Sequence, residues 1–183
     1  MEEPARPPLE QASRRIARTA DDLAAAIRGR SDAALARRPD GMSWAAKEII
    51  CHLRDTEELF LMRLEVIAAV DEPMIHAAGM GARAMGLKPD GGPVAPDRWA
   101  EDRQYLRNDV GEALGAFRKR REETLAHLAA LSPEQWLRGG IHPRRGRMTV
   151  SDFVREMAWH DDNHLDQLRR ALDGVSARSG DAS

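Results

Sequence analysis

The chain has 183 residues, with 28 lysine or arginine and 30 aspartate or glutamate residues, and a formal net charge of −2. Because the two signs are interspersed without a basic stripe, we expect no nucleic-acid partner. The single cysteine, Cys51, excludes an intrachain disulfide and fits a reducing cytoplasm. The N-terminus lacks the apolar core of a signal peptide, and no apolar run approaches the ~18 residues of a membrane span, so no membrane association is expected.

The composition favours helices over strands, because alanine, leucine, arginine and glutamate are common while aromatic residues make up only 4%. We expect flexible ends over residues 1–8 and 174–183 and one helical domain over residues 9–173. The first helix is predicted from about Leu9 to Arg28. An apolar stripe runs along it, and Gly29 stands at its natural end.

The second helix follows a short capped turn at residues 31–35. It is predicted to begin after Ser43, a good N-cap, and to end near Val70. Its apolar stripe contains one histidine, His52. Residues 71–96, rich in glycine and proline, then form the longest irregular segment, which is either a crossover connection or a lid over a pocket.

The third helix is predicted from Asp97 to about Leu131. Two glycines within it, Gly111 and Gly115, indicate a kink or a close approach to another helix. His127 lies off the apolar stripe of this helix, and we expect it at the surface.

A capped turn at residues 132–136 and a loop at residues 139–147 lead to the fourth helix. This helix is predicted to begin at Thr149, with Asp152 in the capping-box position, and to end near Leu172. Four long amphipathic helices in one domain predict an all-α fold, a four-helix bundle with a long crossover between helices two and three.

Two histidines occupy the buried face of the fourth helix. His160 and His164 are four residues apart, and they continue an apolar stripe. Burying two imidazoles without partners is costly, so either hydrogen bonds to neighbours or a metal ion must satisfy them. His52 is the candidate third ligand, and three neutral imidazoles would leave one coordination position open.

Several neighbours of these histidines have two interpretations. Asp55, one turn from His52, is either a general base or an ordinary solvated helix residue. Cys51 points about a hundred degrees away from His52, so we expect it to pack rather than bind the same ion. The spacing of His160 and His164 mimics the zinc-peptidase motif, but an aspartate replaces the longer glutamate and no further ligand follows, so a peptidase is disfavoured.

Three polar residues of the fourth helix complete the candidate set. Gln167 follows His164 by three residues and is expected to form a polar wall of the pocket. Glu156 precedes His160 by four residues and either supports the ligands or lies at the surface. Asp161 points sideways from the stripe, and we expect it to cap or pair at the surface.

Two stretches resemble the DinB/YfiT-like superfamily of four-helix-bundle proteins, which also holds bacillithiol S-transferases and mycothiol-dependent maleylpyruvate isomerases. They are residues 43–57, SWAAKEIICHLRDTE, and residues 159–168, WHDDNHLDQL. Connecting segments at residues 117–121, 131–136 and 140–150 look similar as well. The resemblance covers nearly the whole chain, from about Leu9 to Leu172.

The resemblance implies an up-down-down-up bundle in which His52, His160 and His164 hold a divalent metal ion, zinc or nickel. It also implies a small-molecule substrate and a homodimer. The predicted function is a metal-dependent hydrolase or a low-molecular-weight-thiol S-transferase that uses a metal-bound water or thiolate. The alternative is a non-catalytic dimeric bundle or ligand-binding module in which the histidines and the metal are structural.

Overall fold

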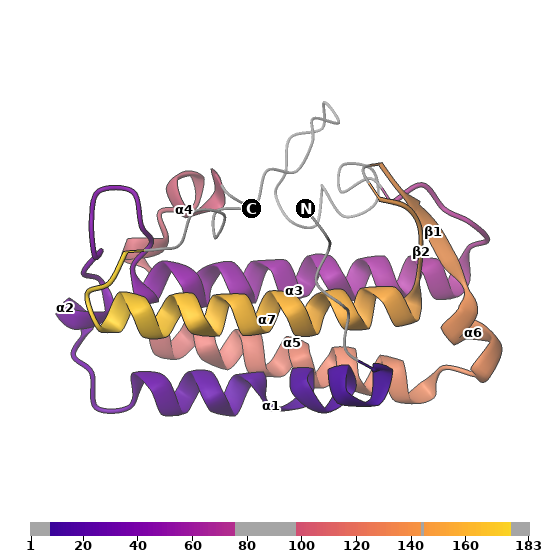
Figure 1. The fold of residues 1–183 in the computed structure, drawn as a ribbon, viewed down its shortest axis with the longest axis horizontal. Coiled ribbons are helices and arrows are strands. Elements are labelled where there is room, and N and C mark those ends of the chain that lie inside the picture. The colour runs from indigo at the N-terminus through magenta and orange to yellow at the C-terminus, as the bar shows by residue number, and fades with distance from the viewer. Residues whose placement is uncertain (1–7, 76–97, 144, 177–183) are drawn as a thin grey trace.

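Four long helices lie side by side in the computed structural model, which describes residues 8–75, 98–143 and 145–176 (Figure 1). These helices are α1 Leu9–Ile27, α3 Ala46–Ala69, α5 Val110–Ala130 and α7 Val150–Leu172. Figure 1 shows α3 and α5 running in one direction and α1 and α7 in the other, which is the up-down-down-up order. The predicted all-α four-helix bundle is therefore confirmed. None of the described helices is long and apolar enough to cross a membrane.

Shorter elements join the long helices at both ends of the bundle. They are α2 Asp32–Leu35, α4 Trp99–Asp102, the 3-10 helix η2 Tyr105–Arg107, α6 Pro133–Leu137, and the strands β1 Gly139–His142 and β2 Gly146–Thr149. The predicted loop at residues 139–147 is wrong, because β1 and β2 pair there as an antiparallel hairpin. Gly140 is required in this hairpin, since a Cβ atom at this position would stand 2.6 Å from the side chain of Ile75.

Side-chain caps begin α5 and α7, and of these two the cap of α7 was predicted. The capping box of α7 is confirmed, because Thr149 accepts the N–H of Asp152 and Asp152 accepts the N–H of Thr149. Ser43 is not the N-cap of α3. Instead, Ala45 takes that position and donates its N–H to the Glu48 carboxylate at 2.9 Å.

The third helix begins later than the sequence indicated. Its N-cap is Asp109, which accepts the N–H of Glu112. Before it, Gln104 has a left-handed backbone with φ of 49°, which separates α4 from η2, and the extended backbone of Asn108 and Asp109 separates η2 from α5. Gly111 and Gly115 interrupt nothing within α5 and mark no approach to another helix within the described residues. The predicted start at Asp97 and nearly all of the segment interpreted as a lid lie outside the described residues.

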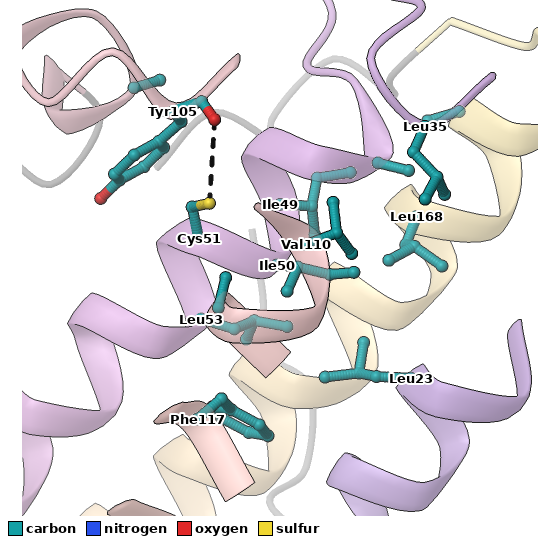
Figure 2. Packing of buried hydrophobic residues seen from close by; sticks show 14 of the residues in the cluster. Leu23, Leu35, Ile49, Ile50, Cys51, Leu53, Tyr105, Val110, Phe117 and Leu168 are labelled. Carbon is teal, nitrogen blue, oxygen red and sulfur yellow. Dashed lines mark hydrogen bonds between the residues drawn. The ribbon is translucent and has the colours of Figure 1, made fainter. Parts of the chain in front are cut away.

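The apolar core is divided into two clusters, one toward each end of the bundle. Figure 2 shows the first cluster, in which Leu23, Leu168 and Phe117 bring α1, α7 and α5 against α3. Cys51 lies in this cluster, its Sγ 3.9 Å from the carbonyl oxygen of Tyr105 (Figure 2). Burial raises the pKa of the Cys51 thiol to about 11, so the predicted packing role is confirmed and the thiol stays protonated at neutral pH.

Candidate metal centre

Three histidines converge between α3 and α7, and we call them the histidine centre: His52, His160 and His164. The ring centroids lie 4.4 Å apart for His160 and His164, 4.6 Å for His52 and His164, and 5.5 Å for His52 and His160. His52 and His164 are buried, and His160 is partly buried. The sequence analysis selected these three residues, and the fold brings their rings together.

The donor set fits a divalent transition metal. One ligand nitrogen from each ring can be chosen so that all three lie within 4.8 Å of one another. A tetrahedral zinc ion with nitrogens bound at about 2.0–2.1 Å holds those nitrogens about 3.4 Å apart, so the rings would have to draw together by up to about 1.4 Å. Imidazole suits zinc and nickel alike. Among the described residues, no carboxylate or thiol joins the group.

Two aromatic side chains form walls of the histidine centre. The Trp44 ring stacks on His164 at an interplanar angle of 12° and a centroid distance of 6.2 Å, and it lies 4.9 Å from His52. Phe60 meets His160 edge-on at 5.5 Å. These rings limit the rotation of the imidazoles and keep water from their faces. The sequence analysis missed both roles, although Phe60 follows His52 at helical spacing.

Gln167 fixes the orientation of His164. Nδ1 of His164 lies 2.8 Å from Oε1 of Gln167, which leaves Nε2 as the nitrogen available to a ligand. Burial, reinforced by the neighbouring His160, lowers the pKa of His164 to about 3. His164 is therefore neutral at pH 7, the form that binds a metal ion. Gln167 thus contacts a candidate ligand, while its predicted role as a polar wall of a pocket stays a prediction.

Beside the histidine centre lies a buried ionic cluster, which we call the arginine network. Arg121 of α5 donates to Glu57 of α3 at 2.7 Å and to Asp161 of α7 at 2.6 Å. Thr19 of α1 donates to Asp161, and Thr124 of α5 donates to Glu57 at 2.6 Å. All five residues are at most 2% exposed. The network therefore ties together all four long helices between the two apolar clusters.

Asp161 is the clearest correction to the sequence analysis. It does not cap or pair at the surface, since it is 1% exposed and bonded to Arg121 and Thr19. Burial alone would raise its pKa, but the charge of Arg121 and the hydrogen bonds hold the pKa of Asp161 well below its usual range. It immediately follows His160, whose Nδ1 lies 4.0 Å from Oδ1 of Asp161. That distance is too long for a hydrogen bond, yet it places a negative charge beside the centre.

Asp55 belongs to a different cluster. Its carboxylate accepts hydrogen bonds from Arg54 at 2.7 Å, from Arg103 at 2.6 Å and from the Tyr105 hydroxyl at 2.7 Å. Burial acts to raise the pKa of Asp55, but the Arg54 and Tyr105 hydrogen bonds and the arginine charges lower it overall. Asp55 is thus buried rather than solvated. These contacts hold α4 and η2 against α3, and the general-base role stays a prediction.

Two further candidates lie apart from the three rings. Glu156 is partly buried and is bonded to Arg145, which is 38% exposed. His127 is half-buried on α5, so it is less exposed than the surface position expected for it. Neither residue belongs to the group of three that could hold a metal ion.

Comparison with known proteins agrees with this architecture. The family model of the DinB superfamily matches residues 15–168, and the chain therefore belongs to the DinB superfamily. Among solved structures, it is similar to YfiT from Bacillus subtilis, described as a probable metal-dependent hydrolase with an unusual four-helix bundle topology. The two share 17% sequence identity and a TM-score of 0.75, over 96% of this chain and 93% of YfiT, so the likeness establishes the fold. No curated protein matches the chain.

Proposed function

We propose that this protein is a metal-dependent enzyme whose histidine centre holds one divalent zinc or nickel ion. The observation that carries the proposal is the convergence of three imidazoles inside the bundle, with His164 kept neutral by burial. Membership of the DinB superfamily and the description of YfiT as a probable metal-dependent hydrolase support it. A bound divalent ion would supply a Lewis acid that lowers the pKa of a coordinated water or thiol.

The chain itself contributes orientation and exclusion of water. Gln167 fixes the orientation of the His164 ring. Trp44 stacks on His164, and Phe60 packs against His160. Asp161 adds a fixed negative charge next to His160, which favours a cation in the centre. With three histidines as protein ligands, a position stays open for a small-molecule substrate. Hydrolysis of an amide or ester and transfer of a low-molecular-weight thiol both fit this arrangement.

Ligand exchange tests the proposal. Cobalt(II) has a visible spectrum that reports its coordination, and it binds the ligands that zinc binds. Protein loaded with cobalt should show a new absorption band when azide is added and a thiolate charge-transfer band when a thiol is added. A cobalt spectrum that responds to neither ligand would indicate a closed site, and the proposal would then give way to a non-catalytic bundle with a structural metal.

A further inference from the structure

Arg63 is a charged side chain of α3 on the same face as His52. It follows His52 by eleven residues, and at about 100° per residue this spacing brings the two Cβ directions to within about 20°. The two backbones are roughly 16 Å apart along the helix axis. Side chains of a helix lean toward its N-terminus, so Arg63 leans back toward Phe60, whose ring touches His160. Arg63 therefore lies on the His52 side of α3, one turn beyond Phe60.

The guanidinium group of Arg63 has no hydrogen-bond or ion-pair partner among the described residues, although its Nε atom is buried. Leaving a buried cation without a partner costs free energy. Burial lowers the pKa of Arg63 to about 10, which still leaves it positively charged at neutral pH. Arg63 is thus a partly buried cation without a bonded anion among residues 8–75, 98–143 and 145–176.

The charged residues that act on Arg63 do not neutralise it. Glu156, on α7, favours the Arg63 cation, whereas Arg145 opposes it. Glu156 is already bonded to Arg145. Arg63, Arg145 and Glu156 together carry an excess of one positive charge.

We propose that Arg63 binds the anionic group of a substrate whose reacting end lies at the histidine centre. This inference rests on the proposed function and narrows its substrate class to anions. A guanidinium presents two parallel N–H groups that match a carboxylate or a phosphate. Because the backbones of Arg63 and His52 are about 16 Å apart along α3, the anionic group lies several bonds from the atom that reaches the metal ion.

A matched pair of ligands tests the inference in cobalt-loaded protein. Mercaptohexanoate and mercaptohexanol, each with a terminal thiol, differ in the far end of the chain, which is a carboxylate in one and a hydroxyl in the other. Their affinities are read from the thiolate charge-transfer band. We expect the acid to bind about tenfold more tightly than the alcohol in wild type, because a charge-assisted hydrogen bond forms at Arg63.

Three variants separate the role of Arg63 from general effects of charge. Arg63→Gln should lose the preference for the acid. Arg63→Lys should keep part of the preference, because lysine retains the positive charge but lacks the two parallel N–H donors of a guanidinium. Arg28→Gln, which removes an exposed arginine at the end of α1, should keep the full preference. Equal affinities for acid and alcohol in wild type, or an undiminished preference in Arg63→Gln, would overturn the inference. A wild type that binds no cobalt would overturn the proposed function as well.

A measurement without metal gives a second readout. Since an unpaired buried cation destabilises the fold, Arg63→Met should melt at the same temperature as wild type or higher in the presence of a chelator. A melting temperature several degrees lower than that of wild type would show that Arg63 stabilises the bundle, and this result would overturn its assignment as a ligand-binding residue.

Discussion

The histidine centre and the arginine network lie next to each other in one bundle, but their polar groups are satisfied differently. In the network, every carboxylate oxygen of Glu57 and Asp161 accepts a hydrogen bond from a side chain of the network itself. In the centre, three imidazoles converge at centroid distances of 4.4–5.5 Å, and Gln167 holds one of them from the side. The comparison indicates that the network holds the fold together, whereas the centre is arranged for a ligand.

The largest expected effect comes from breaking the arginine network. Arg121→Met leaves two buried carboxylates without their cation, and we expect the free energy of unfolding to fall by about 3–5 kcal/mol. Arg118→Met is the matched control, because Arg118 pairs with the exposed Asp21 and should change stability by less than about 1 kcal/mol. Urea denaturation measures both. Equal losses in the two variants would mean that the network contributes no more than a surface ion pair.

Next in size is the effect of releasing His164 from its partner. Gln167→Leu removes the acceptor that orients the ring, and we expect the affinity for zinc to fall by about 10–100-fold. Competition with a chromogenic chelator measures that affinity. Gln11→Leu, at an exposed position on α1, serves as the control and should bind zinc like wild type. Unchanged affinity in Gln167→Leu would show that the packing of Trp44 alone orients His164.

Asp55 extends the comparison of the arginine network with the histidine centre. Like the carboxylates of the network, it is buried and bonded to arginine side chains. Asp55→Asn should lower the free energy of unfolding by about 1–3 kcal/mol, since Arg54 and Arg103 lose a charged acceptor. Zinc content should stay as in wild type. If Asp55→Asn instead left stability unchanged and abolished turnover of a substrate, the general-base prediction would be correct and the structural role wrong.

An effect of similar size is expected from pH in metal-free protein. The pKa of His164 is about 3 in the folded chain and about 6.5 in the unfolded chain, so only the unfolded state takes up this proton between those values. Stability is therefore full above pH 6.5 and falls as pH falls toward 3. Urea midpoints at pH 7.5 and 4.5 should differ less in His164→Gln than in wild type. An equal difference between the two midpoints in both proteins would contradict the assignment of this pH dependence to His164.

Much of the fold was predictable because it depends on local patterns. The apolar stripes and the caps at Thr149 and Ser132 gave helices close to the observed ones. The histidine centre was predictable for a related reason, since His160 and His164 replace apolar residues on a buried stripe. The hairpin at residues 139–149 was missed, because its strands are short and contain glycine and arginine, and tertiary contacts at Ile75 hold them.

The arginine network was missed because charged residues usually lie in water. Asp161 was placed at the surface on this ground. A signal was nevertheless present in α5, where Arg121 and Thr124 stand between Phe117 and Leu128 at the spacing of the buried stripe. Which carboxylates would meet Arg121 depends on how α3 and α7 pack against α5, and no local pattern of one helix contains that information.

Metal content tests the central claim most directly. Protein purified without an affinity tag should carry about one zinc or nickel ion per chain by plasma mass spectrometry, as expected for a three-histidine centre with an open position. The His52→Ala variant should carry almost none, while Arg28→Gln should match wild type. No metal in wild type after reconstitution, or equal metal in His52→Ala and wild type, would contradict the assignment of the three histidines as ligands.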